Sequence, residues 1–321
     1  MKKGLSIIIC CYNSEARLPK TLEYLAKQEI SKDIPVELII VDNASSDHTK
    51  EIARKEWEKY KTHFLFRIID EEKKGQMHAR KKGVLESQYE YILFCDDDNW
   101  LQSNYLEIAF NLMESNERIG ALGGQGIAVS DIDLPEWFSD FAWGFAAGKQ
   151  AKESGDISKR GFIWGAGMTT RRYLLIKVFD DNYPFLMQGR TGSQLSSGDD
   201  TEICKRILLL RQLLYYDEAL SFYHYMSPNR LTWAYKKKLC EGLDYAKITM
   251  RKYDVIFNEI NRSALKRYLG ILYNMLKLVK PSSSNMDIKT DLWAKIGLLL
   301  KSEKMVKDWE YKNIIKFALQ K

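Results

Sequence analysis

Strand-like and helix-like segments alternate through the N-terminal third of this 321-residue chain, and no other sequence feature constrains its fold as strongly. The apolar runs that predict strands span residues 5–11, 36–41, 64–69 and 91–95. The segments between them that predict helices span about residues 13–28, 47–60 and 75–87. Strands joined by helices in this order form a mostly parallel sheet with helices on both faces. We therefore expect a Rossmann-like α/β fold.

Three consecutive carboxylates, Asp96, Asp97 and Asp98, follow the last of these apolar runs directly. The carboxyl ends of strands in open α/β sheets border the crevice where ligands bind. Because side chains alternate along a strand, we expect Asp96 and Asp98 on one face and Asp97 on the other, so that one face carries two oxygen donors. Adjacent carboxylates repel one another unless a cation lies among them, and their oxygens suit Mg²⁺ or Mn²⁺. We predict a metal site that holds a diphosphate; the alternative is a helix cap.

The overall charge of +6 conceals a strongly basic C-terminal region. Residues 230–321 carry 20 Lys and Arg against 9 Asp and Glu, a net charge of +11, whereas residues 1–229 carry −5. Apolar residues recur there at helical spacing, as in Leu265, Tyr268, Leu269, Leu272 and Leu276. Basic amphipathic helices can bind an anionic membrane surface, but the same charge is typical of a solvated face or a protein-docking surface. We expect no nucleic-acid partner, because the lysines are not interleaved with an aromatic platform.

The chain shows no sign of a membrane-spanning or exported segment. No apolar run approaches the ~20 residues that cross a bilayer, and the Met-Lys-Lys start leads into a strand rather than a signal peptide. Its five cysteines are scattered without metal-site spacing, which favours reduced thiols. We expect a cytoplasmic protein, with peripheral attachment to the inner face of the membrane left open.

Four motifs, in sequence order, resemble the signature of family 2 glycosyltransferases with the GT-A fold. They are residues 6–13 (SIIICCYN), residues 41–47 (VDNASSD), Gly75 with residues 79–83 (ARKKG), and the aspartate run at 96–98. The resemblance covers about residues 4–225. Where the family's first strand usually ends in proline, this chain has cysteine, and we expect the turn to be kept without the ring.

The resemblance implies a GT-A domain over residues 1–228 and a basic amphipathic helical region over residues 229–321. The GT-A domain would consist of a nucleotide-sugar-binding half, residues 1–100, and an acceptor-binding half, residues 101–228.

For the donor, the resemblance assigns binding roles to Tyr12, Asn13, Asp42 and Arg80. The ring of Tyr12 can stack on a nucleobase, and Asp42 can accept hydrogen bonds from a uracil N–H or a ribose hydroxyl. The guanidinium of Arg80 can pair with the donor phosphates in a fork geometry. Each residue also has a structural alternative, such as a packing tyrosine, a turn-forming aspartate or a surface arginine.

For the metal, the resemblance implies Mn²⁺ or Mg²⁺ bound by Asp98, Asp96 and His224. Asp96 and Asp97 are also expected to contact the nucleotide-sugar. His224 lies among aromatic residues, where a buried structural histidine is the alternative interpretation.

For the acceptor, the resemblance points to the second half of the domain. Trp164 can stack on a sugar ring, and Gly165 lets the backbone approach a ligand closely. Asp199 and Asp200 match the family's acidic pair before a helix, which we expect to extend to about residue 214. Inverting transfer needs a carboxylate that takes the proton of the acceptor hydroxyl, and we assign this role to Asp200. Arg230 is a further expected contact on this side, to the acceptor or the diphosphate.

The predicted function is a metal-dependent inverting glycosyltransferase. It would move a sugar from a nucleotide-diphosphate sugar, UDP-linked in our interpretation, to a hydroxyl of a glycan, a lipid-linked glycan or another acceptor. A non-catalytic regulatory or scaffold protein that binds nucleotide-sugars is one alternative, which the carboxylates at both 96–98 and 199–200 argue against. A nucleotidyltransferase is the other alternative. It would need a glycine- and arginine-rich phosphate loop near the N-terminus, and residues 11–14 (CYNS) offer none.

Overall fold

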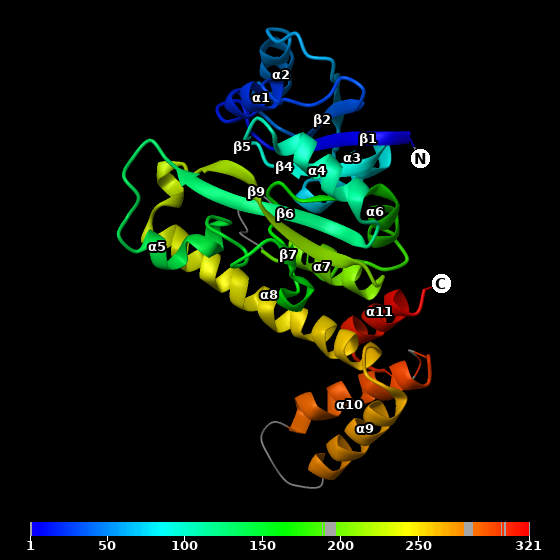
Figure 1. Cartoon of the computed structure of the whole chain (residues 1–321). Helices are drawn as coiled ribbons and strands as arrows, with labels where there is room; N and C mark the ends of the chain where they lie inside the picture. Colours follow the sequence, from blue (N-terminus) through cyan, green and yellow to red (C-terminus); the bar gives the residue numbers. More distant parts are fainter. Residues whose placement is uncertain are drawn as a thin grey trace.

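One β-sheet organises the chain (Figure 1). The computed structural model describes residues 2–187, 189, 197–278, 285–302, 304 and 306–320. The strands within these residues are β1 (Lys2–Cys11), β2 (Val36–Asp42), β3 (Leu65–Asp70), β4 (Tyr89–Cys95), β5 (Asn99–Leu101), β6 (Ile119–Val129), β7 (Gly155–Asp156), β8 (Thr169–Arg171) and β9 (Leu213–Tyr225). Their order in the sheet is β3-β2-β1-β4-β8-β6-β9-β5, and β7 pairs with β9.

The first half of the sheet confirms the predicted alternation of strands and helices. β1 pairs in parallel with β2 and β4, and β2 pairs in parallel with β3. The connecting helices are α1 (Leu18–Ala26), α2 (Thr49–Trp57) and α3 (Gln76–Glu86). α1 begins later than predicted, because residues 14–17 form a turn in which the carbonyl of Ser14 accepts from the N–H groups of Arg17 and Leu18 at 3.0 Å.

The second half of the sheet is mixed. β8 is antiparallel to both β4 and β6, β6 is parallel to β9, and β5 is antiparallel to β9. The remaining helices are α4 (Tyr105–Ser115), α5 (Phe138–Phe141), α6 (Arg172–Val178), α7 (Asp199–Leu209), α8 (Trp233–Ile260), α9 (Ala264–Leu278), α10 (Asn285–Leu299) and α11 (Trp309–Ala318). Short 3₁₀ helices are η1 (Ala142–Phe145), η2 (Ser158–Arg160) and η3 (Pro228–Arg230).

Two local predictions are wrong. The helix expected to reach about residue 214 ends at Leu209, because Arg211 turns the chain with a φ of 65° and Leu213 begins β9. The face alternation expected for Asp96 to Asp98 does not apply, because β4 ends at Cys95. The aspartates lie instead in a turn that the N–H of Asn99 closes by donating to the carbonyl of Asp96 at 3.1 Å.

Side chains of β1 enter two separate cores. Ile7 and Ile9 pack on the side of α1 and α2, whereas Ile8 packs on the side of α3. α3 lies very close to the sheet at Gly83, where an added Cβ would be 2.6 Å from a methyl carbon of Ile8. This close packing fixes α3, and with it Arg80, against the strand ends.

A buried polar network attaches the C-terminal helices to the sheet domain. Arg206 of α7 is fully buried. It donates to Glu202 at 3.0 Å and to the Tyr253 hydroxyl of α8 at 3.2 Å. It also donates to three backbone carbonyls at 2.7 to 2.8 Å, those of Val178, Tyr183 and Pro184. Glu202 in turn accepts from Tyr253 at 2.7 Å and from the backbone N–H groups of Leu186 and Met187. One network therefore holds α7, α8 and residues 183–187 together.

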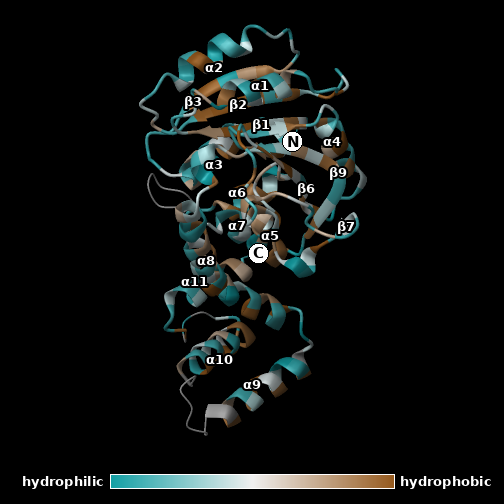
Figure 2. Cartoon of the chain, turned by 90° about the vertical axis from the view of Figure 1, so that its left-hand side faces the viewer, coloured by the Kyte–Doolittle hydropathy of each residue, from teal (hydrophilic) through white to brown (hydrophobic). Residues whose placement is uncertain are grey.

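The C-terminal helices extend away from the sheet. α8 packs against α7, and α9 and α10 form a pair at the opposite end of the molecule from β2 (Figures 1 and 2). α11 returns to pack against α7 and α8. None of the helices in the described part of the chain combines the length and apolarity that a membrane crossing requires.

Candidate functional site

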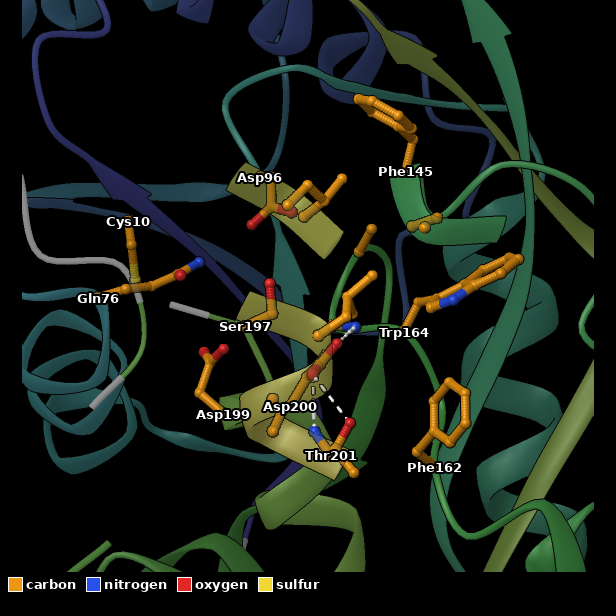
Figure 3. Close-up of a pocket in the computed structure, with 18 of the residues that line it drawn as sticks. Cys10, Gln76, Asp96, Phe145, Phe162, Trp164, Ser197, Asp199, Asp200 and Thr201 are labelled. Atoms are coloured by element: carbon orange, nitrogen blue, oxygen red, sulfur yellow. Dashed lines mark hydrogen bonds between the residues drawn. The ribbon is translucent and has the colours of Figure 1, made fainter. Parts of the chain in front are cut away.

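A pocket with a volume of about 1110 Å³ opens at the carboxyl ends of β1 and β4. Its lining comes from the loop after β1, from α3, from the turn after β4, from residues 160–166, from the start of α7 and from α8. Figure 3 shows Asp200 in its middle, with Cys10, Gln76 and Asp199 on one side and Trp164 and Phe162 on the other. Segments that are far apart in the sequence therefore form one site.

The three aspartates after β4 have different environments. Asp97 is buried and pairs with Arg17 of the loop before α1, at 2.6 Å. Burial and the neighbouring charge of Asp98 raise the pKa of Asp97, although Arg17 opposes this. Asp98 pairs with Arg230 at 2.7 Å, and Asp96 lines the pocket near its centre (Figure 3).

Two of the three predicted metal ligands lie together. An oxygen of Asp98 is 3.4 Å from Nε2 of His224. Two ligands of one octahedral ion with bonds near 2.1 Å are roughly 3 Å apart, so this pair suits a shared Mg²⁺ or Mn²⁺. Within the described residues, however, no group of three or more His, Cys, Asp or Glu side chains is arranged to hold a metal. Asp96 lines the same pocket and would have to supply the third ligand.

Arg80 and Asp199 form a buried ion pair across the pocket. Nη1 of Arg80 lies 2.7 Å from a carboxylate oxygen of Asp199, and both side chains are less than a tenth exposed. Burial alone would lower the pKa of Arg80, but the charges of Asp199 and Asp96 raise it overall. The pair joins α3 to α7. Asp199, predicted to contact the acceptor, is thus bound to Arg80, predicted to contact the donor, and both residues line the pocket.

Asp200 is held by backbone donors. One carboxylate oxygen accepts from the N–H of Gly165 at 2.9 Å, and the other accepts from the N–H of Thr201 at 2.7 Å. Burial, followed by the charge of Asp199, raises the pKa of Asp200, which makes its carboxylate a stronger base. Any side chain at residue 165 would crowd this arrangement, because a Cβ there would be 2.8 Å from Nη2 of Arg80. Asp200 is thus fixed in the pocket and suited to accept a proton.

The predicted nucleotide-binding residues lie near the edge of the pocket. Tyr12 lines it, is 42% exposed, and has the ammonium of Lys74 5.6 Å from its ring centre. Asp42 is buried and does not line the pocket, although its neighbour Asn43 does; its Oδ1 has no hydrogen-bond partner among the described residues. Asn13 does not line the pocket; its side chain accepts from the N–H of Ser46 at 2.8 Å and so ties the loop after β1 to the loop after β2. A positioning role therefore suits Asn13 better than direct contact.

Aromatic residues form the opposite wall. Trp164 and Phe145 are buried at the pocket surface, Phe162 lies beside them, and Tyr235 of α8 stacks on Phe145 with ring centres 6.0 Å apart. The C-terminal helical region expected from residue 229 onward therefore contributes to the site, and the division at residue 228 stays a prediction.

Sequence reasoning missed five of the described cationic residues that line this pocket: Arg17, Lys74, Arg160, Lys205 and Lys247. Lys205 gave a signal, since it interrupts the apolar residues of α7, and it pairs with Asp254 of α8. Arg17 and Arg160 gave no such signal in the sequence, because neither belongs to a motif and both reach the pocket only through tertiary contacts.

Comparisons with known proteins agree with this arrangement. The family model for glycosyl transferase family 2 matches residues 6–179. A cholesterol galactosyltransferase from Borreliella burgdorferi is 32% identical over 111 residues, which are 34% of this chain and 29% of that protein. The glycosyltransferase AglE from Haloferax volcanii is 29% identical over 212 residues, 63% of this chain and 60% of AglE. The chain thus spans less than a third of the first relative and about three fifths of the second.

Among solved structures, Staphylococcus aureus TarS 1-349 in complex with UDP-GlcNAc superposes with a TM-score of 0.54 at 17% identity. The match covers 99% of this chain and 90% of that one. At this identity the likeness concerns the fold, and it confirms the predicted GT-A type α/β architecture with C-terminal helices.

Proposed function

Because the chain belongs to glycosyl transferase family 2, we propose that it is an inverting enzyme that transfers a sugar from a UDP-linked donor to an acceptor hydroxyl. One observation carries the proposal: the carboxylate of Asp200 is fixed by two backbone donors, in one pocket with Arg80 and the aspartates after β4. The UDP-GlcNAc complex of TarS, which has the same fold, supports a UDP-sugar as the donor.

The proposed reaction uses Asp200 as the general base. Its carboxylate takes the proton of the acceptor hydroxyl while the hydroxyl oxygen attacks the anomeric carbon. The bond from that carbon to the diphosphate oxygen breaks on the opposite face, and its electron pair leaves with the nucleotide. Arg80 stabilises the negative charge that builds on the diphosphate, because its guanidinium lies in a largely water-excluded part of the pocket.

At the nucleotide end, we propose that the nucleobase stacks on Tyr12. Asp42 would accept a hydrogen bond from the uracil N–H or from a ribose hydroxyl. The half-exposed ring of Tyr12 offers a stacking face. Asp42 lies next to Asn43 of the pocket lining, and its buried Oδ1 is an acceptor without a partner among the described residues. Because Asp42 does not itself line the pocket, a ligand N–H or O–H would reach it only after the loop that covers it moves. Asn13 would act by holding the two loops that carry these residues.

We assign Mn²⁺ or Mg²⁺ to Asp98, His224 and Asp96. Such an ion, when bound, supplies positive charge that offsets the charge of the leaving diphosphate. Asp97 would take part indirectly, because its pair with Arg17 fixes the turn that carries Asp96 and Asp98. Arg230, already paired with Asp98, lies where it can also contact the diphosphate.

Titration of the protein with UDP, in Mn²⁺ and in excess chelator, tests this donor site. UDP should bind in Mn²⁺, and Asp98→Asn should weaken binding about tenfold or more, since losing one ligand commonly costs over 1.4 kcal/mol. Chelator should weaken UDP binding to the native protein to a similar degree and change little in the variant. The matched control is Asp33→Asn, an exposed aspartate outside the pocket. Equal UDP affinity with and without the metal would remove the ion from the proposal.

The two alternative functions give different products. A non-catalytic binding protein would bind UDP-sugars and release no nucleotide beyond the rate of the Asp200→Asn variant. A nucleotidyltransferase would join a nucleoside triphosphate to a sugar phosphate, forming a nucleotide-sugar and releasing pyrophosphate. The protein is incubated with a UDP-sugar and, separately, with UTP and a sugar phosphate, and ion-exchange chromatography then separates UDP from pyrophosphate. UDP indicates a glycosyltransferase, pyrophosphate a nucleotidyltransferase, and neither product a binding protein.

We also propose peripheral association with an anionic membrane through one face of α9. Its exposed apolar residues, here called the α9 face, are Leu265, Tyr268, Leu269, Leu272 and Leu276, each 47 to 69% exposed. Ile271, on the other side of the helix, is buried. The basic charge of residues 230–321 complements anionic headgroups, and such a face embeds in the headgroup boundary without crossing the bilayer.

Leu272→Glu should reduce binding to phosphatidylglycerol vesicles at low salt by about tenfold, because it removes apolar burial worth roughly 1.5–3 kcal/mol and adds a repelled charge. Cosedimentation with vesicles measures this. Leu65→Glu, at an exposed position on β3 at the other end of the molecule, is the control and should bind like the native protein. If the native protein ignores these vesicles at low salt, the membrane proposal fails.

A further inference from the structure

Four arginines among the described residues line the pocket, and one of them differs from the rest. Three pair with an aspartate at 2.6 to 2.7 Å, namely Arg17 with Asp97, Arg80 with Asp199, and Arg230 with Asp98. Arg160, the fourth, has no carboxylate partner among the described residues. In the described part of the pocket, the guanidinium of Arg160 thus lacks a direct ion pair, and the charge of Asp200 acts on it only from beyond ion-pair distance.

Arg160 is nevertheless held firmly. Its guanidinium lies 4.1 Å from the ring centre of Phe162 and 5.1 Å from that of Trp164. Its Nη1 donates to Oε1 of Gln150, a buried side chain. The same Oε1 accepts from the N–H of Trp164 at 3.1 Å, and Nε2 of Gln150 donates to the carbonyl of Gly124 at 2.8 Å. The side chain is therefore preorganised, and little conformational freedom would be lost on binding a ligand.

Arg160 also lies on the acceptor side of the pocket. Phe162 and Trp164, which it covers, are across Asp200 from Asp199 and Cys10 (Figure 3). Asp199 is bound to Arg80, the residue assigned to the donor diphosphate. A group that contacts Arg160 would therefore belong to the acceptor.

Burial of the guanidinium gives a physical reason for a ligand there. Partial burial lowers the pKa of Arg160, because the loss of nearby water outweighs the opposing effects of Cys204 and Asp200. An anion that pairs with the fork of the guanidinium would restore the balance of charge and would bind with defined geometry.

We propose that Arg160 binds an anionic group, a phosphate or a carboxylate, on the acceptor. This inference rests on the proposed function, since it takes the pocket to be a transferase site. It names the acceptor class as an anionic glycan, polyol phosphate or lipid-linked phosphate, and it makes Arg160 the residue that selects it.

The test compares matched charged and neutral probes on protein saturated with UDP and Mn²⁺, so that the donor side is filled. The pairs are methyl β-D-glucuronide with methyl β-D-glucoside for a carboxylate, and glycerol 3-phosphate with glycerol for a phosphate. Ligand-observed NMR titration should show at least one charged probe binding about tenfold or more tightly than its neutral partner. Which pair responds distinguishes carboxylate from phosphate.

Arg160→Gln should reduce this preference to about twofold or less, whereas Arg160→Lys should keep part of it because the charge remains. UDP affinity of both variants should match that of the native protein, which shows that they fold. Lys149→Gln, at an exposed position outside the pocket, is the charge-matched control and should keep the preference.

Three results would overturn the inference: native protein that binds charged and neutral probes alike, a preference that survives Arg160→Gln, or a variant that weakens both members of a pair equally. The last result would mean that Arg160 only supports the aromatic wall. UDP binding is measured in the same samples. Its absence would contradict the proposed donor site, whereas normal UDP binding without probe discrimination contradicts only the role of Arg160.

Discussion

Replacing Asp200 with asparagine should lower the rate of sugar transfer by roughly 10²–10⁴-fold, because an amide of the same shape cannot take the proton of the acceptor hydroxyl. UDP affinity should stay within about twofold, since the lost function acts in the chemical step. Nucleotide release with saturating donor measures the first effect, and UDP titration measures the second. Asp33→Asn is again the control. Loss of UDP binding with an unchanged rate at saturating donor would make Asp200 a structural residue.

The same role predicts how the rate depends on pH. Asp200 acts only as a carboxylate, and burial together with Asp199 raises its pKa above the ordinary aspartate value. As pH falls through this raised pKa, Asp200 gains a proton and the rate should fall with it. This acid limb should therefore begin at a higher pH than an exposed aspartate would give. The residual activity of the Asp200→Asn variant should show no such acid limb.

Arg206→Ala should destabilise the protein by roughly 3–5 kcal/mol, because it leaves the fully buried carboxylate of Glu202 without its charge partner. The change also removes the donors to the carbonyls of Val178, Tyr183 and Pro184. Urea unfolding followed by circular dichroism measures the free energy of unfolding.

The control for this prediction is a second arginine that pairs across C-terminal helices at the surface. Arg251 of α8 binds Asp291 of α10 at 2.9 Å, but its side chain is half exposed. Arg251→Ala should therefore cost less than about 1 kcal/mol. If both variants lose the same free energy, the buried network does not fasten α8 to α7 as described.

The sequence predicted the parallel half of the sheet well, for a physical reason. The strands β1, β2 and β4 are nearly continuous apolar runs because both faces of a parallel sheet are covered. Their carboxyl ends are marked by polar residues, as at Asp42 and Asp96. Local patterns of this kind are visible without the fold, so the aspartate run could be assigned to the crevice at the strand ends, whereas the assignment of Asp200 rests on the family resemblance.

The rest of the site depended on contacts that no local pattern records. Residues 199–214 contain no glycine or proline that would end a helix, yet Arg211 adopts a left-handed φ and β9 follows. The pairs of Arg17 with Asp97 and Arg230 with Asp98 join positions 80 and 132 residues apart. The contribution of α8 to the pocket likewise follows from the buried contact of Tyr253 with α7, which only tertiary structure reveals.

The most direct test of the central claim is a panel of nucleoside-diphosphate sugars, followed by release of the nucleotide in the presence and absence of Mn²⁺. The account predicts that a UDP-sugar releases UDP with the native protein, that Mn²⁺ accelerates the release, and that Asp200→Asn falls to background. Release of no nucleotide from any donor, or equal release by the native protein and Asp200→Asn, would contradict the claim that this pocket is a glycosyltransferase active site.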